Sequence, residues 1–236
     1  MIDRVEAGEP RLLAFLRSHP RISKVVESDV QGIRFSTGQW HRAVHQGNPG
    51  APLAGLVELM DNNPLVCADE ASVPDPASTL ALIALGPLIR AGLLAERPTM
   101  MLSQDASEDL IAPFLALEGW SEGLTLDAQS LELGTAVAAT VIAAIHTPSR
   151  AEDLDDLYAE AYGRSFFVRR DEDSEWDTRL VVDKAHALFR IRLAEDQPQS
   201  LLTIQVMADE HGKCGQAQLI HCMNVMAGFE ETLGIA

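Results

Sequence analysis

The sequence predicts a mixed fold, of α/β type in the first half of the chain and of α+β type in the second. Helical and strand-like segments alternate up to about residue 130, whereas from Gly134 the order becomes strand, helix, strand, strand, helix. That second order is typical of helices packed on one largely antiparallel sheet. A length of 236 residues accommodates one large domain or two small ones.

In the first half, apolar spacing predicts helices over residues 9–17, 78–94 and 107–117, and strands over 22–26 and 99–102. Pro20 prevents the first helix from continuing. Ser78 or Thr79 can cap the second helix, Pro87 should kink it, and Gly92 helps to end it. Residues 31–64 show little sustained periodicity, so their order and fold stay open.

In the second half, a strand over residues 134–146 carries small and branched side chains that suit packing on both faces. Ser149 can cap the next helix, and four acidic residues in its first turns suit the positive end of the helix dipole. Strands over 178–193 and 200–207 and a helix over 213–228 complete the chain.

The composition limits the kinds of molecule that the protein is expected to bind. A net charge of −17 repels phosphate backbones and argues against nucleic acid. No apolar run is long enough to cross a bilayer, and the first residues do not follow a signal-peptide pattern, so we expect no membrane partner and a cytoplasmic protein. Cys67, Cys214 and Cys222 do not form a secreted disulfide framework, which indicates free, buried thiols.

Four segments in order resemble the N-acetyl-gamma-glutamyl-phosphate reductases of the semialdehyde dehydrogenase family. The stretches DLYAEAYGRSFFVRR and MNVMAGFEETLGI are similar to the family's LYxxxYxxxxFVRV and MNLMFGxxETTGL motifs. STLALIALGPLIRAGLL resembles the helix after its catalytic cysteine, and RLLAFLRSHPRISKVV resembles the helix and strand after its dinucleotide-binding turn. The resemblance implies a vestigial, cropped Rossmann-like segment over residues 1–75 and a semialdehyde-dehydrogenase-type α+β dimerisation and substrate domain over residues 76–236.

The residues for the family's chemistry are missing at their expected places. The family reduces an acyl phosphate with NADPH through a cysteine thioester, but the matched helix puts Pro76 where the nucleophile belongs. Residues 103–126 contain no histidine for acid-base work, and His146, in IHTP, reads better as a strand-end residue. Only Gly8 remains near the glycine-rich turn, so no normal NADP site is expected.

A few residues elsewhere in the chain are candidates for a relocated nucleophile or cofactor contact. Cys67 and Cys214 are the candidate nucleophiles, although the apolar neighbours of Cys67 indicate a buried thiol in a strand interior. Lys213, Gly215 and Gln218 fit the family's DNxxKGAAGQ loop only approximately and are candidate cofactor contacts.

Two further sets of residues were weighed. The first set consists of possible metal ligands: His211, Cys214, His221 and Cys222. Their spacing is unlike that of known zinc sites, so no metal is expected. The second set is basic and indicates either a solvated sheet face or a retained pocket for a small anionic metabolite: it comprises Arg169, Arg170, Arg179, Lys184, Arg190 and Arg192.

We therefore expect a catalytically inactive relative of these reductases, without a cofactor, that acts as a dimerising binding, regulatory or scaffold protein in arginine-type amino-acid biosynthesis. Its expected partners are a second copy of itself or a related reductase. The alternative is an NADP-dependent oxidoreductase that acts on an acyl phosphate or semialdehyde with relocated active-site residues, and it predicts NADPH binding.

Overall fold

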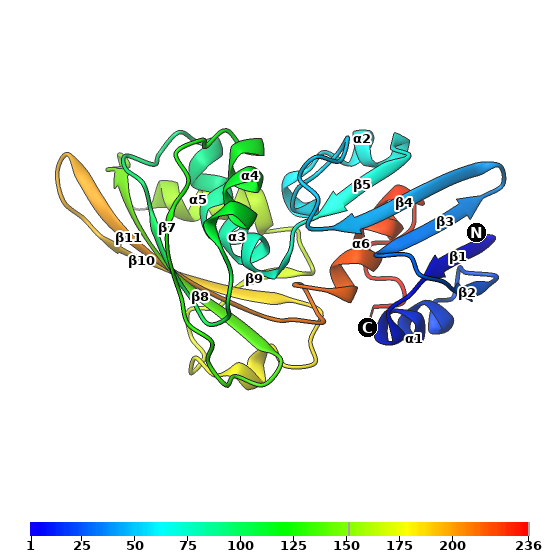
Figure 1. Cartoon of the computed structure of the whole chain (residues 1–236). Helices are drawn as coiled ribbons and strands as arrows, with labels where there is room; N and C mark the ends of the chain where they lie inside the picture. Colours follow the sequence, from blue (N-terminus) through cyan, green and yellow to red (C-terminus); the bar gives the residue numbers. More distant parts are fainter. Residues whose placement is uncertain (151, 236) are drawn as a thin grey trace. The chain divides into compact units, whose positions relative to one another are not determined.

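The computed structural model describes the whole chain except residues 151 and 236 (Figure 1). It divides into two compact units, the first formed by residues 1–75 and 215–236 and the second by residues 76–214. The division after Asp75 is where the sequence analysis divided the chain, but residues 215–236 return to the first unit instead of staying with the second. Among the described residues, no helix is long and apolar enough to cross a membrane.

The first unit is built on a five-stranded mixed sheet in the order β2-β1-β3-β4-β5. Its strands are β1 (Arg4–Ala7), β2 (Val25–Glu27), β3 (Ile33–Thr37), β4 (Trp40–Gln46) and β5 (Glu70–Val73). The pairs β1–β2 and β4–β5 are parallel, whereas β3 runs antiparallel to both of its neighbours. Its helices are α1 (Pro10–Ser18), the 3-10 helix η1 (Val57–Leu59), α2 (Asn62–Cys67) and α6 (Gln216–Met226).

Strand alternation gives this sheet one apolar and one polar face. Val5, Ile33, Phe35 and Val44 are buried on the apolar face, against which α1 and α6 pack. The segment over residues 31–64 is therefore ordered: a β3–β4 hairpin turns at Gly38 with φ +61, and η1 and the start of α2 follow.

The C-terminal tail is held to the first unit through Asn224. This buried side chain donates to the carbonyl oxygens of Glu231 (3.1 Å) and Leu233 (2.9 Å), and its Oδ1 lies 3.1 Å from His19 Nε2. Gly234 has φ +72 and lies against the His19 ring, where an added Cβ would collide with the imidazole. The closing motif therefore has a structural role in packing the tail.

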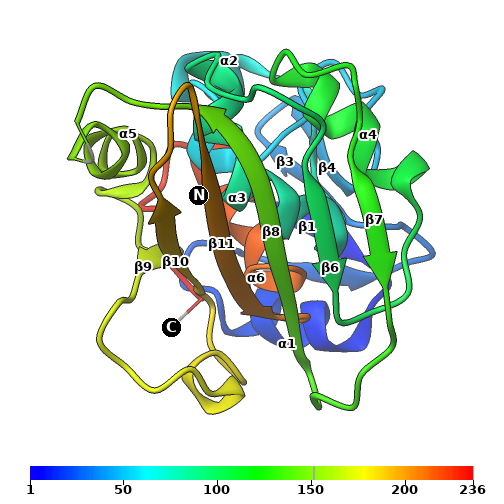
Figure 2. The same ribbon diagram turned by 90° about the vertical axis from the view of Figure 1, so that its left-hand side faces the viewer.

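The second unit is a six-stranded mixed sheet in the order β7-β6-β8-β11-β10-β9. Its strands are β6 (Thr99–Leu102), β7 (Thr125–Ala128), β8 (Ala136–His146), β9 (Val168–Arg170), β10 (Ala187–Ala194) and β11 (Gln199–Asp209). The long β8, β11 and β10 are antiparallel, while β7 and β9 add parallel edges, so the prediction of a largely antiparallel sheet is confirmed. Figure 2 looks onto the outer face of this sheet, with α3 (Pro76–Arg90) behind it.

Two tyrosines join α3 to α5 (Glu152–Tyr162) behind the sheet. Pro87 lies inside α3 and removes one backbone N–H donor, which loosens the preceding turn. The Tyr158 hydroxyl donates to the Ala84 carbonyl at 2.5 Å, and the Tyr162 hydroxyl donates to the Leu82 carbonyl at 3.1 Å. Burial raises the pKa of Tyr158 far above its usual value, so this hydroxyl stays a donor.

Several predicted boundaries shift. The second helix begins at Pro76 instead of at a Ser78 or Thr79 cap, because proline suits the first helical turn, and it ends at Arg90 before Gly92 with φ +65. α4 (Glu108–Leu117) follows Ser107 as expected.

β8 is fully buried on one face only, whereas the other face is half-buried. The helix expected after Ser149 is α5; residue 151, ahead of it, lies outside the described residues.

The predicted strand over residues 178–193 is wrong in its first part. Thr178–Leu180 form the 3-10 helix η2, because Asp177 accepts from the Arg179 N–H at 2.8 Å, and only residues 187–194 form β10. Between them Asp183 adopts φ +58, which no extended strand allows. The last helix begins at Gln216, later than expected, because residues 209–214 form a turn around Asp209.

Candidate functional site

The turn between β1 and α1, formed by Gly8, Glu9 and Pro10, stands where a dinucleotide-binding fold holds pyrophosphate on a helix N-terminus. Glu9 is the N-cap of α1, and its carboxylate accepts from the N–H groups of Arg11 (3.0 Å) and Leu12 (2.7 Å). Pro10, the first helical residue, has no N–H. A protein carboxylate therefore already uses the amides that a phosphate would need.

Gly8 does not open a cradle for phosphate either. A Cβ built on this residue would lie 2.6 Å from the Ser28 carbonyl oxygen, so the missing side chain makes room for the chain after β2. The Ser28 N–H also donates to the Ala7 carbonyl at 3.0 Å, which fixes that approach. Together with Glu9, this packing does not fit a pyrophosphate group.

In the second unit, the first residue of α3 is Pro76, the position at which the resembled enzymes have their nucleophile. Proline has no nucleophilic atom. The nearest thiol is that of Cys214, whose Sγ lies 3.8 Å from the Pro76 carbonyl oxygen and donates to it. Cys214 is fully buried, whereas a nucleophile must be an accessible thiolate.

The turn over residues 209–214, here the Asp209 turn, presents Lys213 and Cys214. Asp209 Oδ1 accepts from the N–H of His211 at 2.8 Å, and its Oδ2 accepts from the Thr135 hydroxyl at 2.5 Å and from the Asp183 N–H at 3.0 Å. Lys213 is fully buried, with its Nζ 5.7 Å from the centre of the Phe167 ring. The sequence analysis named Lys213 as a candidate cofactor contact and Cys214 as a candidate nucleophile, and both lie on this one turn.

The remaining cofactor candidates belong to the first unit. Gly215 is the N-cap residue of α6, and the buried Gln218 donates from Nε2 to the Pro74 carbonyl at 3.2 Å. Gln218 therefore holds the end of β5 against α6. This contact explains its place in the motif by packing within the unit.

Cys67 is not where the sequence predicted it. It is the last residue of α2 and is exposed, so the predictions of a strand interior and of a buried thiol are wrong. The apolar run PLVC predicted a buried strand, but only Leu65 of this run faces the core, and Val66 is 39% exposed. The three cysteines are thiols and not disulfides. His146 is the exposed last residue of β8, as predicted.

In the described part of the chain, no group of three or more His, Cys, Asp or Glu side chains could hold a metal ion. His211 pairs with Glu210 at 3.0 Å. The buried His221 lies between carboxylates, with Nε2 3.1 Å from Glu231 and Nδ1 3.9 Å from Glu58. Both histidines of the candidate metal set therefore have carboxylate neighbours.

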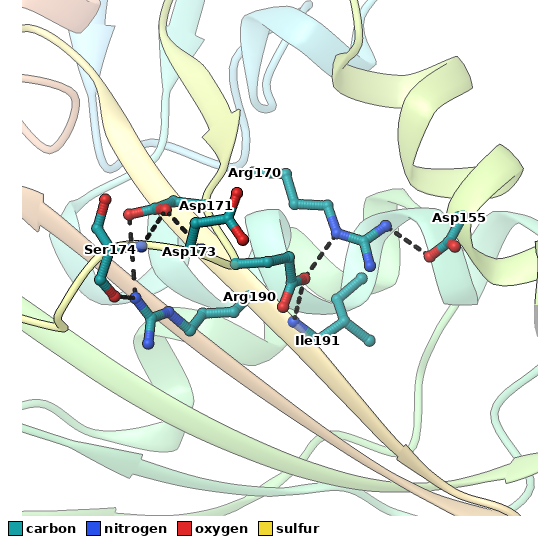
Figure 3. A network of polar contacts seen from close by, with 8 residues as sticks. Asp155, Arg170, Asp171, Asp173, Ser174, Arg190 and Ile191 are labelled. Carbon is teal, nitrogen blue, oxygen red and sulfur yellow. Dashed lines mark hydrogen bonds and ion pairs between the residues drawn. The ribbon is translucent and has the colours of Figure 1, made fainter.

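The basic residues of the second half mostly face carboxylates or carbonyls of the same unit (Figure 3). Arg170 bonds Asp155 at 2.5 Å and Glu172 at 2.7 Å. Arg190 donates to the Ser174 carbonyl at 2.5 Å, and its guanidinium lies 4.2 Å from the centre of the Trp176 ring.

Hydrogen bonds from neighbouring residues also lower the pKa values of two acids in this region. The Ser174 N–H lowers the pKa of Asp171, and the exposed pair with Arg179 lowers the pKa of Asp177 to about 2. Lys184 and Arg192 are solvent-exposed. This pattern resembles a compensated surface more than an anion pocket.

The sequence analysis missed the role of Glu9. The signal was present, since an acidic residue directly before a proline at a helix start can accept from the free amides of the first turn. In the segment DRVEAGE the sequence analysis used only the glycine, because a dinucleotide-binding turn depends on glycines.

Comparison with known proteins gives distant but consistent relatives, although no family model matches the chain. It is 23% identical to the N-acetyl-gamma-glutamyl-phosphate reductase of Bacillus cereus over 85% of this chain and 67% of that protein. With the same enzyme from a Psychrobacter species it shares 37% identity, over 35% of this chain and 23% of that protein.

Among solved structures, aspartate semialdehyde dehydrogenase II from Vibrio cholerae matches with a TM-score of 0.67 at 12% identity, over 97% of this chain and 99% of that chain. At this identity the likeness shows the fold alone. The sequence relatives and the shared fold agree: the chain is a distant homologue of the N-acetyl-gamma-glutamyl-phosphate reductases and has the fold of an aspartate semialdehyde dehydrogenase.

Proposed function

We propose that this chain is a non-catalytic member of the family, a dimerising binding protein that regulates or scaffolds amino-acid biosynthesis of the arginine type. The observation that carries the proposal is the Glu9 carboxylate on the first amides of α1. A second anion at the same amides would meet both a used donor set and a negative charge. NADPH then has no pyrophosphate seat in the first unit.

The reacting end supports the same proposal. Pro76 supplies no nucleophile, and the thiol of Cys214 is buried and donates its proton to a carbonyl oxygen. Acyl transfer to sulfur needs a thiolate with access to the substrate carbonyl. Loss of both the cofactor seat and the nucleophile removes two separate steps of the reduction.

The test is direct. NADPH is titrated into the full chain by calorimetry and by nicotinamide fluorescence, and its oxidation is followed with N-acetyl-glutamyl phosphate as substrate. We expect neither micromolar binding nor turnover. Micromolar binding together with oxidation of NADPH would refute the proposal.

The outer face of the six-stranded sheet is a suitable dimer surface. Met101 is 40% exposed and Leu201 49% exposed, and Thr140, Ile142 and Thr203 lie between them on the same face. Exposed apolar side chains on a sheet face favour a protein partner over solvent.

A second copy is the occupant we propose, because the charges at the two sides of this face are opposite. Asp127 lies on β7, and Arg192 lies on β10; each strand is two positions from the central β8. A twofold axis parallel to β8 brings β7 of one copy over β10 of its partner, so that Asp127 and Arg192 face each other twice with an offset of two residues along the strands. The surface is thus self-complementary.

Light scattering with charge variants tests this arrangement. Asp127→Arg and Arg192→Asp should each shift the protein toward monomer, because like charges then meet, and the double variant should restore the dimer. A chain that is monomeric at all concentrations, or a dimer that is indifferent to both changes, would contradict it. Co-purification with an active reductase and not with itself would favour a heteromer.

One observation favours a second candidate, an NADP-dependent oxidoreductase that acts on an acyl phosphate or semialdehyde. Cys214 lies beside Pro76, the expected nucleophile position, and the buried Lys213 is its neighbour in the chain. This candidate requires a bound nucleotide. It predicts that Cys214→Ser abolishes turnover while Cys67→Ser, at the exposed thiol, leaves turnover unchanged.

A further inference from the structure

The polar face of the five-stranded sheet carries charged side chains in two neighbouring rows. Cross-strand pairing aligns Arg4 on β1, Ser36 on β3 and His41 on β4 in the first row. The second row, two residues along, aligns four residues: Glu6, Arg34, Ala43 and Glu70. The first row is basic, and the second has carboxylates at both ends.

Small residues at the centre of these rows leave a hollow. Ser36 and Ala43 form its floor, while the long side chains of Arg4, Arg34 and Glu70 rise around them and border a solvent-open volume of about 450 Å³. A second hollow of about 430 Å³, toward Ser28 to Gln31 and His45, shares Glu6 and Arg34 with the first. Volumes of this order are typical of small-molecule sites.

The charges around the hollow are only partly satisfied. Arg4 pairs with Glu6 at 2.8 Å, and His45 pairs with Glu70 at 3.1 Å. Within the described residues, the side chains of Arg34 and His41 have no ion pair or hydrogen bond. Donors are thus available at Arg34 and His41, and each carboxylate has further lone pairs for an ammonium group.

We propose that this hollow binds a free α-amino acid. Its carboxylate accepts from Arg34, with the Ser36 hydroxyl and the His41 ring of the first row beside it, and its ammonium group donates to Glu6 or Glu70, which flank Arg34 in the second row. A simple anion would leave the carboxylates facing it at close range, and a simple cation would face Arg34, so the mixed charges around the hollow select a dipolar ion. The site lies on the face opposite α1, so it is separate from the β1–α1 turn and goes beyond the proposed loss of catalysis.

The ligand test uses the full chain. The twenty free L-amino acids are screened at millimolar concentration by thermal shift, and the strongest is titrated by calorimetry beside its des-amino and decarboxylated analogues. We expect the amino acid to bind at least tenfold more tightly than either analogue. No shift with any amino acid, or equal binding of the des-amino analogue, would overturn the proposal.

Variants locate the binding. Arg34→Gln should weaken binding tenfold or more through loss of the charge-assisted contact, and Ala43→Leu, which fills the floor, should abolish it. Arg179→Gln, a change of the same kind at an exposed arginine of the second unit, is the matched control and should bind as the wild type does. Unchanged affinity in Arg34→Gln would overturn the proposal, and this readout stands even if Ala43→Leu fails to fold.

Discussion

Replacing Glu9 by alanine tests the proposal that its carboxylate occupies the amides with which the β1–α1 turn could hold a phosphate. The side chain satisfies two amides of the first turn, at Arg11 and Leu12, which otherwise have no partner within the helix. Loss of an N-cap costs about 1 kcal/mol, within roughly 0.5–2 kcal/mol. In a chain of this length that corresponds to a fall of about 2–4 °C in Tm per kcal/mol.

Urea denaturation and differential scanning calorimetry measure this effect. Glu9→Ser is the control, since serine caps helices well and should retain most of the stability. Neither variant should gain NADPH binding, because Pro10 still lacks an N–H and the chain after β2 still packs on Gly8. An alanine variant as stable as wild type would show that the carboxylate does not hold these amides, and micromolar NADPH binding by it would show that Glu9 alone blocks the site.

Three further predictions concern the retained motifs. Tyr158→Phe should lower the free energy of unfolding by about 1–3 kcal/mol in urea, because the buried Ala84 carbonyl loses its hydroxyl donor. Gly234→Ala should lower Tm measurably, because its Cβ meets the His19 ring at φ +72; a neutral result in calorimetry would contradict the tail packing. Burial lowers the pKa of His19 below 6.5, so the unfolded chain takes up this proton first and stability falls as pH drops below about 6.5; His19→Gln should flatten Tm against pH between 7.5 and 5.5.

Burial lowers the pKa of His19 against the opposing effect of its hydrogen bond to Asn224, and the hydrogen bonds of the ring define its neutral tautomer. Asn224 uses its Nδ2 group for two carbonyls, so its Oδ1 is the acceptor and His19 Nε2 carries the proton. His19 Nδ1 then accepts from the Arg21 N–H at 3.2 Å. The neutral ring satisfies both neighbours, whereas a proton on Nδ1 would face the Arg21 amide.

Periodicity predicted the elements whose signal is local. α1, β6 and α4 have boundaries within about a residue of those expected, because each carries its own apolar stripe and its own end signals. The β3–β4 hairpin was missed, although Gly38 lies between two short runs of strand-forming residues. In β4 the buried Arg42 lies on the apolar face and Ala43 on the polar face, so the alternation that identifies a strand is interrupted there.

The site could not be predicted in the same way because it depends on contacts between distant residues. Cys214 meets Pro76 across 138 positions of the chain, and Asn224 meets His19 across 205. Motif resemblance identified the right segments, but it could not say that Glu9 fills the turn or that Cys67 lies outside the core.

The motif residues that persist and those that are missing differ in their physical roles. Tyr158 holds α3, and Asn224 and Gly234 hold the C-terminal tail, so replacing any of them breaks buried packing. Pro76 and Glu9 occupy positions where the fold needs only a helix start, and each starts its helix well. The proposed loss of catalysis would free both positions to be selected for helix starts alone, so substituting cysteine at Pro76 should lower stability without creating a nucleotide site.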